Sequence, residues 1–161
     1  MDKRIVFIGQ APAKPGSKHD VAGTYVRPWL YHIGLDEQTI IQQCRFYALI
    51  GTFPGSSQQG HLRPTPQQVL EHRPILIALL QDFQPDILVP VGAMAIAEIL
   101  PKTTGTLQDI IGTTYRADPF GCLGHEITII PWPHPSGRST WLSTRPDKVA
   151  TALALLKMSL L

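Results

Sequence analysis

The sequence contains no asparagine, although it has eleven glutamines, so any function that requires an asparagine side chain is excluded. Its two cysteines, Cys44 and Cys122, form no CxxC pair. This excludes an all-cysteine metal centre and a disulfide framework, and it favours a reduced, cytoplasmic protein. Charged residues are scarce at 16%, but hydrophobic residues make up 43%, which is too apolar for disorder. No apolar run is long enough for a membrane span, and Ile5–Ile8 is too short for the core of a signal peptide.

The length of 161 residues fits one domain, which we expect to span residues 1–161. Four short apolar runs rich in β-branched residues predict strands buried on both faces, at Arg4–Ile8, Arg45–Ile50, Asp86–Val91 and Glu126–Ile130. Helical patterns lie between and after them, at Trp29–Ile33, Asp36–Gln43, Thr65–Phe83, Ala93–Leu100 and from near Thr144 onward. This alternation predicts an α/β fold, a three-layer α/β/α sandwich around a central four-stranded, mostly parallel sheet.

Ligands bind such sheets at the carboxyl ends of the strands. The segments expected there are Gly9–Pro28, Gly51–Pro64, the neighbourhood of Gly92, and Trp132–Arg145. They hold one acid, Asp20, and six bases, namely Lys14, Lys18, Arg27, Arg63, Arg138 and Arg145. The rest of the chain has more acids than bases, so the small net charge of +2 is the sum of two unlike parts. We call the six bases in these segments the basic rim. Any one of these bases can be an ordinary solvated side chain, but their segregation suits a polyanion such as a nucleic acid.

The segment Gly9–Gly16, GQAPAKPG, directly follows the first predicted strand. It has neither the G-x-G-x-x-G spacing of a dinucleotide site nor the GK[ST] of a phosphate-binding loop. One interpretation is a rigid, proline-bearing turn. The other is a loop whose backbone lines a pocket at the strand end, with Gln10 pointing into it.

The segment Trp132–Ser139, WPHPSGRS, follows the fourth predicted strand. Prolines on both sides of His134 restrict the backbone, so we expect a held imidazole with a functional rather than a purely structural role. Ser136 lacks the G-x-S-x-G context of a serine nucleophile. We expect it to donate to a phosphate together with Gly137 and Ser139, and Arg138 to contact a phosphate or to wedge into a duplex.

These two loops resemble the two signature motifs of the uracil-DNA glycosylase superfamily, and the resemblance extends over nearly the whole chain. The G-x-A-P-A-x-x-G pattern at Gly9–Gly16 is most similar to the fourth and fifth families, the thermostable-type bacterial and archaeal enzymes, and in particular to the fifth. The sequence departs from the fourth family in lacking the cysteines of its iron–sulfur cluster, and His72 stands where one of them would be.

The resemblance implies that His134 would donate a hydrogen bond to the departing base. From the residues themselves, we expect Gln10 to hold water or bond the base. The acid of the fifth family's first loop has no clean counterpart here, and Asp20, the only acid in the site segments, is expected to support the sugar cation if its loop folds inward. The base pocket would include Gly9, Ala11, Pro12, Tyr25 and Ala48, with Tyr25 stacking on an extruded base. Ala48 aligns near the asparagine that reads uracil in many members. DNA would be bound by Ser136, Gly137, Arg138, Ser139, Lys14 and Arg63.

We therefore predict a monomeric DNA N-glycosylase of base excision repair, acting on uracil or another deaminated base in single- or double-stranded DNA, without metal or cofactor. Because no asparagine is present, the base preference should be broader than that of strict uracil enzymes. Two alternatives remain open. One is a non-catalytic or degenerate DNA-binding protein of the same fold, and the other is a small α/β enzyme that acts on nucleotides or nucleosides.

Overall fold

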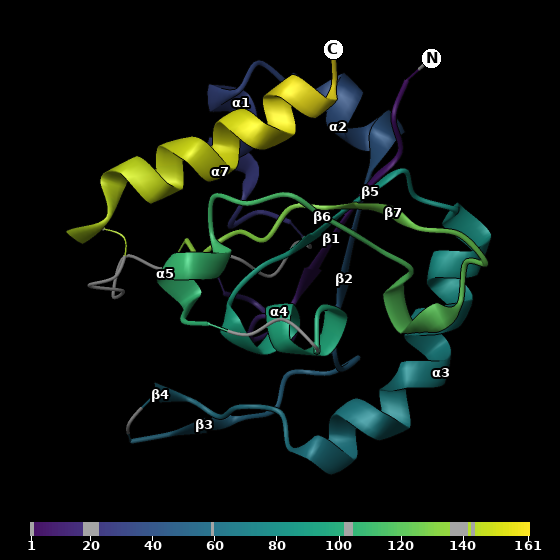
Figure 1. The fold of residues 1–161 in the computed structure, drawn as a ribbon. Helices are drawn as coiled ribbons and strands as arrows, with labels where there is room; N and C mark the ends of the chain where they lie inside the picture. The colour runs from purple at the N-terminus through teal and green to yellow at the C-terminus, as the bar shows by residue number, and fades with distance from the viewer. Residues whose placement is uncertain (1, 18–22, 59, 102–104, 136–141, 143) are drawn as a thin grey trace.

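A computed structural model describes residues 2–17, 23–58, 60–101, 105–135, 142 and 144–161 of the protein. Its centre is a five-stranded sheet in the order β2-β1-β5-β7-β6 (Figure 1). The four parallel strands are β1 (Ile5–Gly9), β2 (Cys44–Ala48), β5 (Ile87–Pro90) and β7 (Ile127–Ile129). The fifth strand, β6 (Tyr115–Ala117), pairs antiparallel with β7 at one edge.

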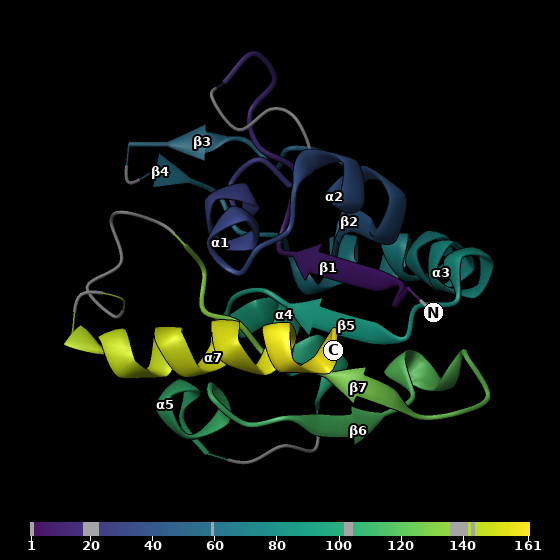
Figure 2. The same cartoon turned by 90° about the horizontal axis from the view of Figure 1, so that it is seen from above.

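Helices cover both faces of this sheet, so the predicted three-layer sandwich is confirmed (Figures 1 and 2). One face packs against α1 (Arg27–His32), α2 (Glu37–Gln43), α5 (Leu107–Ile110) and α7 (Pro146–Ser159). The other face packs against α3 (Pro66–Phe83), α4 (Ala93–Ile99) and the short 3₁₀ helix η1 (Pro119–Gly121). Within the described residues, no helix has the length and apolar content that a bilayer span requires.

The prediction of four strands was wrong by one, because it omitted β6. Arg116 at its centre is exposed, and the flanking Tyr115 and Ala117 are only partly buried. An edge strand of three residues with this exposure has no continuous apolar run, so the pattern that reveals buried strands is missing from it. A two-stranded hairpin, β3 (Ser56–Ser57) and β4 (Gly60–His61), was also not predicted.

The strand β1 shows why this sequence forms a central strand. Ile5, Val6, Phe7 and Ile8 are all fully buried, and alternate side chains point to opposite faces. Ile5 and Phe7 join the core under α1 and α7, whereas Val6 and Ile8 join the core under α3 and α4. A strand with helices on both faces needs apolar residues at every position.

The two longest helices follow the sequence signals closely. A capping box between Thr65 and Gln68 starts α3, which passes Pro74 without a break. The helix α7 confirms the helical pattern expected from near Thr144 onward, and its apolar side faces the sheet, with Leu153 and Leu156 buried and Val149 and Leu160 packed at its ends.

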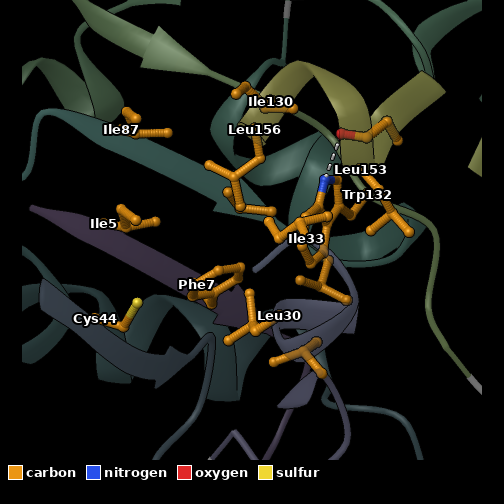
Figure 3. Close-up of a cluster of buried hydrophobic side chains, with 14 of the residues drawn as sticks. Ile5, Phe7, Leu30, Ile33, Cys44, Ile87, Ile130, Trp132, Leu153 and Leu156 are labelled. Atoms are coloured by element: carbon orange, nitrogen blue, oxygen red, sulfur yellow. Dashed lines mark hydrogen bonds between the residues drawn. The ribbon is translucent and has the colours of Figure 1, made fainter. Parts of the chain in front are cut away.

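Trp132, just beyond β7, is the largest fully buried side chain. Its indole lies between Phe7 of β1 and the helix α7, and its N–H donates to the carbonyl of Ala152 at 3.0 Å (Figure 3). A buried indole N–H needs such an acceptor. This bond ties the segment that follows β7 to α7.

Candidate functional site

The strand order places a crevice between β1 and β5. From β1 the chain passes over one face to β2 at the sheet edge, then returns over the other face to β5 on the far side of β1. Such a reversal of direction leaves a crevice outside the carboxyl ends of the two strands. Gly9 ends β1 and Gly92 follows β5, so two glycines border this crevice.

Tyr25 and His134, which belong to different loops, meet at this crevice. Their rings are stacked, with centroids 5.6 Å apart and planes 6° from parallel. The Tyr25 hydroxyl oxygen lies 2.5 Å from the position that a Cβ on Gly9 would occupy, and the His134 Cβ lies 3.6 Å from the same position on Gly92. The ring pair therefore lies across the two strand ends, where a side chain on Gly9 would crowd the Tyr25 hydroxyl and one on Gly92 would make ordinary contact with His134.

The backbone of the His134 loop is held by the sheet on its strand side. The Trp132 N–H donates to the carbonyl of Pro90 at 3.0 Å, and the Gly92 N–H donates to the carbonyl of Trp132 at 2.9 Å. Gly92 has φ = +90°, a conformation that glycine adopts without strain. His134 is two residues beyond this anchor and is exposed, so it lies at the surface while the backbone just before it is restrained.

Tyr25 is placed by the turn that leads from Gly23 into α1. The Gly23 carbonyl accepts from the N–H groups of Val26 and Arg27, both at 3.2 Å. The ring of Phe46 packs directly on Gly23 and stacks on Phe7 at 5.3 Å, which joins this turn to the sheet. Burial raises the pKa of the Tyr25 phenol to about 12, so the hydroxyl is protonated at neutral pH.

The other predicted pocket residues lie around the ends of β1 and β2. Gln10 follows Gly9 and is partly exposed, whereas Ala11 packs against the core under α3 and α4 and Pro12 is exposed. Ala48 ends β2 directly beside Gly9 in the sheet register. The structure thus brings Gly9, Gln10 and Ala48 to one edge, and it turns Ala11 toward the core.

The basic rim is partly neutralised within the protein. Arg27 forms an ion pair with Glu37 at 3.0 Å, and the Tyr31 hydroxyl donates to the same carboxylate at 2.6 Å. Hydrogen bonds from Arg27 and Tyr31 hold the pKa of Glu37 below its usual value. Arg145 donates to the uncharged side chain of Gln108 at 3.2 Å, a contact that leaves its positive charge in place.

Of the predicted DNA-binding residues, Lys14 and Arg63 are exposed. Five predicted site residues lie outside the described part of the chain, namely Asp20, Ser136, Gly137, Arg138 and Ser139. The same holds for Lys18 of the predicted rim.

The cysteines do not fit an iron–sulfur cluster, which requires several thiolates around one centre. Cys44 is buried under α1 and α2, and Cys122 packs on the opposite face of the sheet. Burial raises the pKa of the Cys44 thiol to about 12. His72, at the position of a cluster cysteine in the resembling family, packs with its ring 3.0 Å from the position of a Cβ on Gly51.

A groove of about 700 Å³ lies away from this crevice, between the end of α4 and η1. Arg73 and Glu98 line it and form an ion pair at 2.5 Å, and the Arg73 guanidinium lies over the Phe120 ring. None of the residues that line the groove belongs to the two signature loops. This groove is therefore separate from the strand ends that carry the signature loops, where we locate the candidate site.

Sequence reasoning singled out both loops but missed Trp132 as the anchor of the second loop. The signal was present: a large aromatic residue stands between a predicted strand and a Pro-His-Pro segment. It also missed the pairing of Tyr25 with His134, because the two residues are far apart in the sequence.

Comparison with known proteins agrees with the resemblance of the two loops. The sequence model of the Uracil DNA glycosylase superfamily matches residues 1–157, nearly the entire chain. No curated protein sequence matches.

Proposed function

Because the chain belongs to the uracil DNA glycosylase superfamily, we propose that it hydrolyses the N-glycosidic bond of uracil or another deaminated base in DNA. Membership by itself implies glycosylase-type chemistry in base excision repair and binding to DNA. The observation that carries the more specific proposal is the place of His134. It follows a segment that backbone hydrogen bonds hold beyond β7, lies beside Gly92 near the ends of β1 and β5, and is stacked on Tyr25.

The reaction leaves negative charge on the departing base and positive charge on the sugar. A hydrogen-bond donor held where the negative charge develops lowers the barrier, because it needs no reorganisation during the reaction. His134 is the donor in this proposal, and its target is the base O2. Gln10 holds the attacking water or bonds the base, and Asp20 supports the sugar cation. The reaction written in this way uses neither metal nor cofactor.

Base recognition in this proposal does not use an asparagine, since the chain has none. Ala48 stands at the end of β2 beside Gly9, and its methyl group cannot form the paired hydrogen bonds of an amide. Backbone groups, Gln10 and the shape of the pocket then select the base. A broader preference that includes hypoxanthine and xanthine follows from this set of groups.

Within the superfamily, we place the chain beside the fourth and fifth families but without an iron–sulfur cluster. The support is the G-x-A-P-A-x-x-G pattern at Gly9–Gly16 and the separation of the two cysteines onto opposite sheet faces. DNA binding would involve the exposed Lys14 and Arg63 and the segment 136–139, with the protein acting as a monomer.

The test is release of free base from oligonucleotides that carry uracil, hypoxanthine or xanthine, in single- and double-stranded form. We expect His134→Ala to lower the single-turnover rate by about 10²–10³-fold, the usual effect of removing one such donor. The matched control is His125→Ala. His125 is exposed and lies just before β7, at the opposite end of the strand that His134 follows, so this change should leave the rate unaltered.

If the wild-type protein releases none of these bases, the proposed activity is wrong. Retention of DNA without abasic product, with an affinity that falls steeply as salt rises, would then support a non-catalytic DNA-binding protein. Binding of a free nucleoside that DNA does not compete away would support a nucleoside enzyme instead. An equal loss of activity in both histidine variants would contradict the role given to His134.

A further inference from the structure

Two ring pairs connect the start of α1 with the segment after β7. Trp29 meets Trp132 edge-on, with centroids 5.6 Å apart and planes at 81°. Tyr25 meets His134 face to face, also at 5.6 Å but with planes only 6° from parallel. Each element contributes one residue to each pair, so the same two elements form both contacts.

The chain positions of the four residues keep the two pairs close together. Tyr25 lies in the turn that leads into α1, and Trp29 lies in α1 four residues later. Trp132 and His134 are two residues apart in the segment that follows β7. Docking of Trp29 on Trp132 therefore holds Tyr25 near His134.

The Trp29–Trp132 contact belongs to the hydrophobic core. Trp132 is fully buried, and its indole is hydrogen-bonded to the carbonyl of Ala152. The Tyr25–His134 contact lies one step outward, at the edge of the crevice. Because both Tyr25 and Trp29 pack against this core, folding of the core brings the Tyr25 ring to the imidazole of His134.

We propose that Tyr25 is a positioning residue whose ring fixes the plane of the His134 imidazole toward the crevice between β1 and β5. This inference rests on the proposed function, in which His134 acts on the departing base. The stack covers one face of the imidazole, and Gly92 lies against its Cβ on the strand side. A ring confined in this way has few orientations, so its N–H groups stay aimed while the base enters.

The ring of Tyr25, and not its hydroxyl, performs this task. The hydroxyl oxygen lies over Gly9 at the end of β1, whereas the ring lies parallel to the imidazole. Tyr25→Phe should therefore keep the orientation of His134, and Tyr25→Leu should lose it. A misplacement of about 1 Å in a catalytic group can lower the rate by about 10²-fold.

The experiment compares Tyr25→Leu, Tyr25→Phe and the control Tyr31→Leu. Tyr31 is an exposed tyrosine of the same segment, and its hydroxyl donates to Glu37. We expect Tyr25→Leu to lower kcat by about 10- to 100-fold with little change in KM. Tyr25→Phe should retain most of the rate, and Tyr31→Leu should retain all of it. A merely structural role would instead lower the amount of folded protein and leave kcat per folded molecule unchanged.

Proton NMR of His134 supplies a readout that does not require activity. The carbon-bound ring protons should carry a ring-current shift in the wild type and in Tyr25→Phe and lose it in Tyr25→Leu. If Tyr25→Leu does not fold, Tyr25→Met supplies a second non-aromatic side chain for the same comparison. Unchanged His134 resonances in the non-aromatic variant, or equal losses of kcat in Tyr25→Phe and Tyr25→Leu, would overturn the proposal. Failure of the wild type to release any base would refute the proposed function alone, and the NMR comparison would still decide whether Tyr25 orients His134.

Discussion

The contact between Gly9 and Tyr25 gives a sharp prediction about a single methyl group. Gly9→Ala places a Cβ 2.5 Å from the Tyr25 hydroxyl oxygen, well inside van der Waals contact, and 3.6 Å from the ring carbon that carries it. Gly9 is not among the residues with positive φ, so alanine fits its backbone and the hydroxyl is the obstacle. Overpacking of this kind costs about 1–3 kcal/mol.

Removing that hydroxyl should relieve most of the cost. In the double variant Gly9→Ala/Tyr25→Phe, the nearest remaining tyrosine-derived atom is the ring carbon at 3.6 Å, an ordinary contact distance. We therefore expect Gly9→Ala alone to lower the free energy of unfolding, and the double variant to recover about 1–2 kcal/mol of that loss, a coupling usual for residues in contact.

The assay is urea denaturation of the wild type, the two single variants and the double variant at neutral pH. The coupling energy is read from the four free energies of unfolding. Additive effects, with no recovery in the double variant, would show that the hydroxyl does not occupy the space over Gly9. The contact between the Tyr25 hydroxyl and Gly9 at the end of β1 would then be wrong.

Two further predictions concern Trp132 and the ionisation of Tyr25. Trp132→Phe removes the hydrogen bond to the Ala152 carbonyl, which costs about 1–3 kcal/mol when the partner stays buried. Trp29→Phe, the control, keeps that bond and should cost less in the same urea denaturation; equal costs would contradict the anchoring role. Because burial raises the pKa of Tyr25 from 10.0 to about 12, its neutral form stabilises the fold below pH 10, and this contribution is lost as the pH rises toward 12. In an ultraviolet titration that follows tyrosinate formation, Tyr25→Phe should therefore lack one tyrosine that ionises late, above pH 10. Loss of a tyrosine that titrates near pH 10 would instead refute the burial of Tyr25.

The central strands β1 and β5 were predictable because they are covered on both faces and are buried at every position. Such strands need apolar residues at successive positions, and these runs stand out in the sequence. The edge strand β6 has Arg116 exposed at its centre, so its pairing depends on its neighbour β7 rather than on a local pattern. The start of α1 was predicted at Trp29 but lies at Arg27, although Pro28 marks the first turn of a helix.

The site was predictable at the level of loops and not at the level of contacts. The rule that ligands bind at the carboxyl ends of parallel strands selected the loops that carry Gly9 and His134. The stack between Tyr25 and His134 depends on how α1 docks beside the segment after β7, which no short stretch of sequence encodes. Ala11 shows the same limit, because a residue of the signature loop packs into the core.

The hydrogen bond between the Trp132 indole and α7 has a consequence for the order in which the parts of the chain fold. The N-terminal strand β1 can pair with β2 and β5 early in synthesis, but the core face that it shares with Trp132 is covered by α7, from the far end of the sequence. A nascent chain that has not yet released residues 146–159 from the ribosome exposes this face and leaves the Trp132 indole N–H without its acceptor. The segment that carries His134 should therefore reach its final packing only after α7 has docked on the sheet.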